Sequence, residues 1–127
     1  MFKQNQKILF IIIAVLVLGA LGYYLYWYFA TPGQYDDFAR CLKDKGAIFY
    51  GAFWCPHCQN QKTMFGKSAR LLPYVECSAP DGKSQYQVCI DKKINNYPTW
   101  IFNDESRLVG EIPLSVLAEK TGCVLGH

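Results

Sequence analysis

The chain has 127 residues, of which 51% are hydrophobic and 18% are charged, and its formal net charge is +3. This length allows one compact domain and one further element. Two of the thirteen basic residues, Lys3 and Lys7, lie at the amino terminus, and the remaining charges are nearly balanced and interspersed. We therefore expect no nucleic acid as a partner, because a phosphate backbone requires a stripe of basic residues.

The first predicted element is an uncharged apolar run from Ile8 to Ala30. At ~1.5 Å per residue, a helix of this length crosses a hydrocarbon core of about 30 Å. Lys3 and Lys7 precede the run and acidic residues follow it, which predicts a cytoplasmic amino terminus and an extracytoplasmic remainder. The sequence thus predicts a single-pass protein held in the lipid bilayer through Ile8 to Ala30.

A cleaved signal peptide is the alternative interpretation of this amino terminus, because signal peptides and membrane anchors both begin with basic residues followed by an apolar run. Signal peptides have apolar regions of about 7 to 15 residues and end in small residues. The run here is longer and ends in Trp27-Tyr28-Phe29, which favours an uncleaved anchor with an outer aromatic belt. The predicted organisation is residues 1–30 as cytoplasmic amino terminus and anchor helix, 31–36 as linker, and 37–127 as the folded domain.

The folded domain alternates predicted helices and strands. Helical spacing of apolar residues predicts a helix from Tyr35 to Lys45, and the apolar run from Ala47 to Phe53 predicts a strand buried on both faces. A helix then continues to about Leu72. Further elements are expected at Pro73–Cys77 (strand), Gln85–Lys93 (helix), Thr99–Phe102 (strand), Arg107–Glu111 (hairpin strand) and Pro113–Thr121 (helix). This order predicts an α/β fold with a sheet between helices.

Cys55 and Cys58 lie between the buried strand and the helix that follows it. Pro56 suits the first helical position, which places Cys55 at the cap and Cys58 one turn later on the same face. Unpaired amides and the positive end of the helix dipole favour the Cys55 thiolate there, and a protonated His57 would add to this effect. We therefore predict that Cys55 meets substrates and that Cys58 is the inner, resolving thiol.

The sequence Trp54-Cys55-Pro56-His57-Cys58, followed some forty residues later by Tyr97-Pro98-Thr99, resembles the thioredoxin fold. In that fold the proline before the strand is normally cis, and its loop packs beside the dithiol. From Phe38 to Gly122 the chain is similar to the thioredoxin-like domain fused to bacterial vitamin K epoxide reductase homologues. This closer similarity is carried by Tyr50-Gly51-Ala52-Phe53-Trp54-Cys55-Pro56-His57-Cys58-Gln59, Tyr74-Val75-Glu76-Cys77 and Tyr97-Pro98-Thr99-Trp100.

The resemblance implies a thioredoxin-like fold, with a central mixed sheet flanked by helices, that oxidises thiol-containing protein substrates outside the cytoplasm. The sequence lacks the quinone-binding helices of those homologues, so we expect a separate partner, a membrane quinone reductase of the vitamin K epoxide reductase or DsbB type. Cys-Pro-His-Cys also resembles DsbA-type oxidants, and Phe49 stands where ordinary thioredoxins place a buried acid. A reductase or isomerase with the same fold and thiols is the alternative, and no cofactor is expected.

Aromatic residues near the dithiol have a predicted role in substrate binding. Trp54 and Tyr97 are expected to rim a shallow apolar groove for unfolded polypeptide, and Thr99 is assigned to the same surface. A cis bond before Pro98 would turn the backbone so that neighbouring residues pair with an extended substrate strand. We predict that Pro56, His57 and Pro98 tune the active site.

Four further cysteines complete an even set, as expected in an oxidising compartment. Cys77 and Cys89 are predicted to form a structural disulfide worth ~3 kcal/mol, and a similar pair accompanies the resembled domain. A second shuttle dithiol is the alternative for this pair. Three interpretations remain for Cys41 and Cys123: they are buried free thiols, they form a third disulfide, or they make an intermolecular contact. We do not pair them, because the expected topology places the first and last helices of the domain on opposite sheet faces.

No metal site is predicted. A structural zinc site requires four ligands, usually including a second closely spaced pair, and Cys77 with Cys89 lacks that spacing. His57 lies on a different helix face from the two active-site cysteines, and His127 is the last residue. A two-thiolate Cu(I) site in an anchored metal carrier is the alternative from a different functional class.

Overall fold

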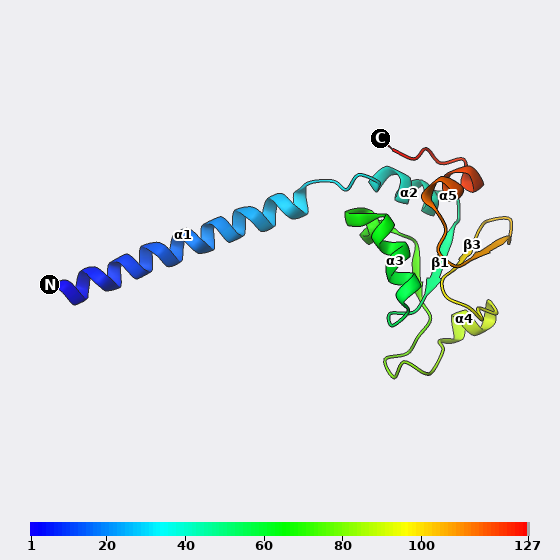
Figure 1. Cartoon of the computed structure of the whole chain (residues 1–127), viewed down its shortest axis with the longest axis horizontal. Coiled ribbons are helices and arrows are strands. Elements are labelled where there is room, and N and C mark those ends of the chain that lie inside the picture. The colour runs from blue at the N-terminus through cyan, green and yellow to red at the C-terminus, as the bar shows by residue number, and fades with distance from the viewer. Residues whose placement is uncertain (127) are drawn as a thin grey trace. The chain divides into compact units, whose positions relative to one another are not determined.

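A computed structural model describes residues 1–126, and His127 lies outside the described residues. The chain divides into two compact units, Met1–Pro32 and the part that begins at Gly33. The first unit is the helix α1, Phe2–Ala30, whose central part is strongly apolar (Figure 1). By length and composition α1 can cross a membrane, a criterion that an amino-terminal signal sequence also meets.

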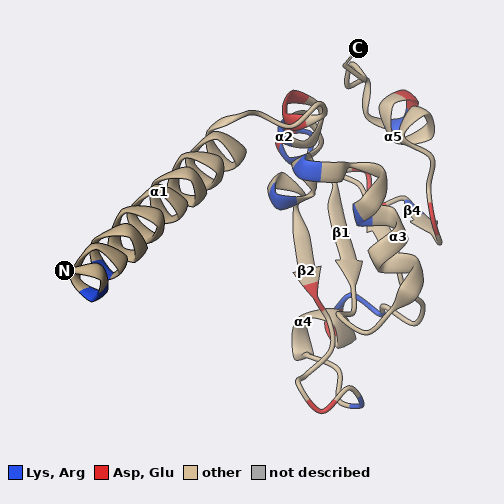
Figure 2. Cartoon of the chain, turned by 60° about the vertical axis from the view of Figure 1, so that its left-hand side comes forward, with Lys and Arg blue, Asp and Glu red and all other residues tan. Residues whose placement is uncertain are grey.

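The second unit is an α/β fold built on a four-stranded sheet. Its strand order is β2-β1-β3-β4, with β2 parallel to β1 and the other two pairings antiparallel. The prediction of a mixed sheet flanked by helices is confirmed, and Figure 2 shows basic and acidic residues interspersed over this unit. The strands are β1 (Ile48–Gly51), β2 (Tyr74–Glu76), β3 (Thr99–Ile101) and β4 (Arg107–Val109); the helices are α2 (Asp36–Asp44), α3 (Pro56–Met64), the 3-10 helix η1 (Gly66–Leu71), α4 (Gln87–Asp91) and α5 (Leu114–Thr121).

Strand β1 is central and buries side chains on both faces, which explains its continuous apolar sequence. Phe49 stacks on Trp100 with ring centroids 4.9 Å apart, in a core that also receives α2, α3 and α5. Tyr50 points to the other face, into a smaller core with Cys77 and Cys89. The loop that carries Cys55 therefore follows a strand that is packed on both faces.

The helix that begins at Pro56 is shorter than the sequence predicted. It ends at Met64, and Gly66 then adopts a φ of +54° before the 3-10 helix η1. Glycine takes this left-handed conformation without the clash that a Cβ would cause. The prediction of one helix to Leu72 is wrong, because the backbone turns at Gly66. The helical spacing of apolar residues continues through η1, so the sequence pattern does not reveal this turn.

The prediction that the first and last helices of the domain lie on opposite sheet faces is wrong. Helices α2 and α5 contribute Leu42 and Leu117 to the same core, and they pack against each other (Figure 1). A disulfide joins Cys41 to Cys123 with a Cα–Cα distance of 5.9 Å. In the connection after β4, the Ile112 N–H donates to Gln61 on α3. Because α3 and α2 contribute to the same core, this connection brings the chain back to their side of the sheet before α5 begins.

Candidate active site

Cys55 and Cys58 lie where β1 leads into α3. Cys55 is the N-cap residue and Pro56 follows it in the first turn, and the Cys58 N–H donates to Cys55 Sγ at 3.2 Å. Both thiols are free. Cys58 is fully buried, whereas Cys55 retains 4% exposure. The Cys58 N–H is thus directed at the Cys55 sulfur from the first turn of α3.

The surroundings of Cys58 raise the pKa of its thiol. Burial, followed by the hydrogen bond with Cys55, raises the pKa of Cys58 to about 12, although the positive charge of Lys62 opposes this shift. Cys58 and Lys62 are four residues apart on α3 and so share a helix face. Near neutral pH Cys58 is therefore a thiol and must lose its proton before it can attack a disulfide.

Tyr74 and Glu76 extend from β2 beside this buried thiol. The Tyr74 hydroxyl donates to Glu76 Oε2 at 2.6 Å, and Lys62 Nζ lies 3.6 Å from the centre of the Tyr74 ring. Burial, with the hydrogen bond to Glu76, raises the pKa of Tyr74. Both residues belong to a segment that carries the family resemblance, but neither was assigned a role in the site from the sequence. Their spacing is a signal that could have found them, because residues two apart on a strand share one face.

Glu76 is also attached to the backbone around the dithiol. Its Oε1 accepts hydrogen bonds from the N–H groups of Phe53 at 3.1 Å and Ser78 at 2.9 Å. Phe53 belongs to the loop that carries Cys55, so the carboxylate connects the end of β2 to that loop. The other carboxylate oxygen, Oε2, accepts the hydrogen bond from the Tyr74 hydroxyl.

A second carboxylate, Glu111, contacts the exposed side of α3. Its Oε1 lies 2.6 Å from His57 Nδ1 and accepts a hydrogen bond of 3.0 Å from the Asn60 amide. The hydrogen bond with His57, and then that with Asn60, hold the pKa of Glu111 below its usual range. His57, predicted as a tuning residue, thus has a partner in the connection between β4 and α5 that the sequence analysis did not identify.

Gln61 holds that connection in place. It is fully buried, its side-chain oxygen accepts the Ile112 N–H at 2.7 Å, and its amide donates to the Ile112 carbonyl at 3.0 Å. The indole N–H of Trp100 also points to the Gln61 oxygen, at 3.5 Å. The pair of bonds to Ile112 positions the neighbouring Glu111 beside His57. A glutamine in a helical pattern gives no sequence signal for such a role.

The loop before β3 lies next to Trp54. The Tyr97–Pro98 peptide bond is cis and Pro98 is buried. The Tyr97 ring packs edge-on against Trp54, with centroids 5.9 Å apart. Trp54 is half exposed, and its indole N–H donates to Ser78 Oγ at 2.8 Å. Trp54 and Tyr97 are thus in contact. Trp54 directly precedes Cys55 in the chain, and Tyr97 directly precedes Pro98.

Thr99, which was assigned to the substrate surface from the sequence, has a side chain that is 3% exposed, and its hydroxyl donates to the Asn96 carbonyl at 2.7 Å. Thr99 begins β3, which has a neighbouring strand on each side. The hydroxyl stabilises the turn into that strand.

A disulfide between Cys77 and Cys89 joins the end of β2 to α4, with a Cα–Cα distance of 5.6 Å. Both residues are fully buried. The loop between them borders a hollow of about 290 Å³ next to the dithiol loop. Its lining residues are Trp54, Ser78, Lys83, Ser84, Gln85, Ile94, Asn95 and Tyr97.

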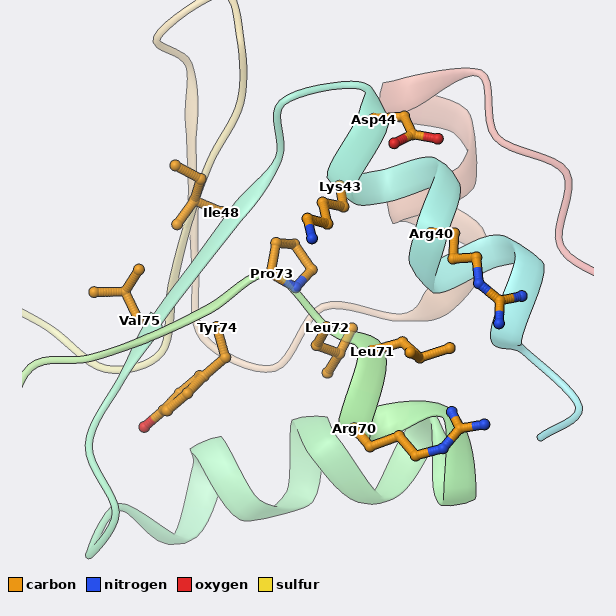
Figure 3. Close-up of a pocket in the computed structure, with 10 residues that line it drawn as sticks. All are labelled: Arg40, Lys43, Asp44, Ile48, Arg70, Leu71, Leu72, Pro73, Tyr74 and Val75. Atoms are coloured by element: carbon orange, nitrogen blue, oxygen red, sulfur yellow. The ribbon is translucent and has the colours of Figure 1, made fainter. Parts of the chain in front are cut away.

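A groove of about 700 Å³ runs between α2, η1 and the edge strand β2 (Figure 3). Both of the arginines that line it are paired, Arg70 with Asp36 at 2.8 Å and Arg40 with Asp37 at 3.2 Å. Tyr74 also lines this groove, and Figure 3 shows its ring extending from β2 towards α3. The other lining residues are Lys43, Asp44, Ile48, Leu71, Leu72, Pro73 and Val75.

Among residues 1–126, no group of three or more His, Cys, Asp and Glu side chains is arranged to hold a metal ion. His57 Nδ1 is directed at Glu111. A Cu(I) site in the described part of the chain would thus have Cys55 and Cys58 as its sulfur ligands.

Comparison with known proteins supports a thioredoxin-like oxidoreductase domain. The chain is 51% identical over 89 residues to thiol-disulfide oxidoreductase LTO1 of Arabidopsis thaliana, a match that covers 66% of this chain and 23% of the relative. It is 34% identical over 82 residues to a thioredoxin domain-containing protein 5 homolog of Drosophila melanogaster, which covers 54% of this chain and 19% of the relative. The chain thus spans less than a quarter of the length of either relative. No protein-family model matches it.

Proposed function

We propose that this chain is a membrane-anchored thiol-disulfide oxidoreductase that passes the Cys55–Cys58 disulfide to thiol-containing proteins outside the cytoplasm. The observation that supports it best is the hydrogen bond from the Cys58 N–H to Cys55 Sγ at the start of α3. It provides a polarised, slightly exposed sulfur with a second, buried sulfur one turn away. The similarity to a named thiol-disulfide oxidoreductase supports the same chemistry.

The proposed reaction is an exchange of disulfides in two steps. A substrate thiolate attacks Cys55 Sγ, the bond between Cys55 and Cys58 breaks, and Cys58 leaves and takes up a proton. A second substrate thiolate then attacks the substrate sulfur of the mixed disulfide, and Cys55 leaves as a thiolate. The substrate loses two electrons, which the reduced dithiol retains. A separate membrane quinone reductase accepts these electrons and regenerates the disulfide.

The direction of electron flow is tested by the reduction potential of Cys55 and Cys58. We expect a value near ~−120 mV, which is that of a strong disulfide donor. A value near ~−270 mV would instead establish the alternative, a thioredoxin-like reductant. The measurement uses the full chain in detergent, equilibrated with thiol–disulfide buffers.

The assignment of Cys55 as the sulfur that meets substrates is tested by trapping. A Cys58→Ala variant cannot resolve its mixed disulfides, so it should accumulate disulfide-linked substrate proteins in oxidising cells. The matched control is the double variant Cys55→Ala/Cys58→Ala, which should trap none. Equal trapping by the single and double variants would contradict the proposal.

The membrane anchor and its orientation are tested in cells that express the full chain. We expect α1 to stay attached and the protein to resist alkaline extraction, whereas a cleaved signal sequence would release a shorter, extractable product. A membrane-impermeant maleimide should label the mildly reduced protein in intact cells if the domain is extracytoplasmic. Labelling only after the cells are opened would reverse the proposed orientation.

The quinone reductase partner is tested by reconstitution in lipid vesicles. The reduced full chain should remain reduced with quinone alone and become oxidised when a membrane quinone reductase of either expected type is added. Oxidation by quinone at the same rate without that enzyme would remove the need for the partner.

A further inference from the structure

The exchange proposed above requires a proton to enter and leave a buried site. Cys58 is fully buried, so its sulfur has no direct contact with bulk water. The titratable groups that interact with it are Cys55 from the active-site loop, Lys62 from α3 and Tyr74 from β2. Glu76, also on β2, accepts a hydrogen bond from Tyr74. Glu111 and His57 pair with each other on the exposed side of α3.

Cys58 and Tyr74 pack closely around the last residue of β1. At Gly51, the position that a Cβ would occupy lies 2.9 Å from Tyr74 Cε2, 3.1 Å from Cys58 Sγ and 3.4 Å from Tyr74 Oη. The thiol and the hydroxyl therefore border the same small space, in which a side chain at position 51 would clash. In the pairing of β1 with β2, Gly51 lies opposite Glu76, so the carboxylate is adjacent to this space.

Glu76 connects the same space to solvent. Its Oε2 accepts the Tyr74 hydroxyl, and its two backbone donors hold it in that orientation. Because Tyr74 donates its own proton to Glu76, the lone pairs of its oxygen are available to accept a proton from Cys58. Glu76 also lines a hollow of about 400 Å³ together with Phe53, Ser78, Pro80 and Tyr86.

We propose that Tyr74 and Glu76 form a proton relay that carries the Cys58 proton between the buried thiol and solvent, an inference that rests on the proposed function. Neither residue was assigned a catalytic or tuning role from the sequence. The relay is specific to Cys58, because Cys55 already has a backbone donor directed at its sulfur.

The relay acts when Cys58 resolves a mixed disulfide between Cys55 and a substrate. The Cys58 proton passes to Tyr74 Oη while the Tyr74 proton passes to Glu76, and Cys58 Sγ attacks Cys55 Sγ. The bond between Cys55 and the substrate sulfur breaks, and the substrate leaves as a thiolate with the electron pair of that bond. Glu76 then releases its proton to solvent. When a substrate thiolate opens the Cys55–Cys58 disulfide, the same protons move in the reverse direction.

The test measures this step by itself, with Ellman's reagent as the disulfide and the mildly reduced full chain in detergent. Attack by Cys55 releases one thionitrobenzoate, and attack by Cys58 on the mixed disulfide releases a second. We expect Tyr74→Phe and Glu76→Gln to slow the second release by about 10- to 100-fold at pH 7 and to leave the first unchanged. The defect should shrink as pH rises, because a larger fraction of Cys58 is then already a thiolate before the attack.

Matched controls separate proton transfer from a general structural effect. Tyr50→Phe removes a hydroxyl from the same sheet but on the face with the smaller core, and Glu119→Gln removes an exposed carboxylate on α5. Both should retain the second release at the wild-type rate and the same pH profile. If the relay variants matched these controls at every pH, the relay would be overturned while the exchange function stood. If the unsubstituted protein gave no second release, the exchange function itself would fail.

Discussion

Two carboxylates lie beside the dithiol helix, and their surroundings differ. Glu76 on β2 accepts one hydroxyl and two backbone N–H groups and is adjacent to the buried Cys58. Glu111, in the connection before α5, accepts hydrogen bonds from the side chains of His57 and Asn60. The His57 side chain is 69% exposed. One carboxylate is therefore fixed by backbone and hydroxyl donors at the sheet, and the other by side chains at the solvated rim of the site.

This difference indicates which charges should matter for chemistry. Interactions near a buried group are screened little, whereas exposed pairs are weakened by water and salt. We therefore expect changes around Cys58 to alter reactivity strongly, and changes around His57 and Glu111 to alter stability slightly.

The largest effect concerns the reactivity of Cys58 itself. With its pKa raised to about 12, from an ordinary value near 9, Cys58 should react with iodoacetamide about 1000-fold more slowly than an ordinary thiol below pH 8. Peptide mass mapping of the mildly reduced protein should find Cys55 modified and Cys58 unmodified. Both should react after unfolding in denaturant. Equal modification in the folded protein would show that the site is not buried in solution.

The next largest effect concerns Gln61, which connects the two sides of α3. Gln61→Leu leaves the N–H and carbonyl of Ile112 without their buried partner and should lower the free energy of unfolding by about 3 kcal/mol. Urea unfolding measures this loss. Gln87→Leu is the matched control, because Gln87 lies on α4 and bonds only to the exposed Asp91 among the described residues. A similar loss in both variants would mean that the Ile112 bonds contribute little.

The two thiols and the alternation of helices and strands could be predicted from the sequence because they depend on local patterns. Cys55 and Cys58 are one helical turn apart, and Pro56 marks the start of the helix. The continuous apolar run of β1 reflects burial on both faces. In each case the residues that carry the signal are close together in the chain.

The partners of the dithiol could not be predicted because they depend on packing between distant segments. Glu76 reaches the site through its register opposite Gly51, and Glu111 through a connection that Gln61 holds against α3. The disulfide between Cys41 and Cys123 depends on α5 returning to the face that α2 covers. None of these arrangements follows from spacing along the chain.

A smaller effect should follow from removing the charge of Lys62. This ammonium group opposes the rise in the Cys58 pKa, so Lys62→Met should raise that pKa further. At pH 7 the second release of thionitrobenzoate should slow by about 3- to 10-fold, and the pH profile should move to higher pH. Lys92→Met, at the exposed end of α4, is the matched control. A faster second release in Lys62→Met would contradict this sign.

The smallest effect is expected at the rim, where Glu111 has a lowered pKa because of its hydrogen bonds with His57 and Asn60. A carboxyl group with a lower pKa in the folded state stabilises the fold above its unfolded pKa, which is ~4.3 for Glu, and loses this contribution as pH falls through the folded value. Glu111→Gln should therefore lower Tm at pH 6 by less than about 2 °C, because the pair is exposed to solvent. The difference from wild type should decrease towards pH 3, and added salt should reduce it at pH 6. Thermal unfolding at several pH values measures it, and a difference that grows on acidification would contradict the assigned role.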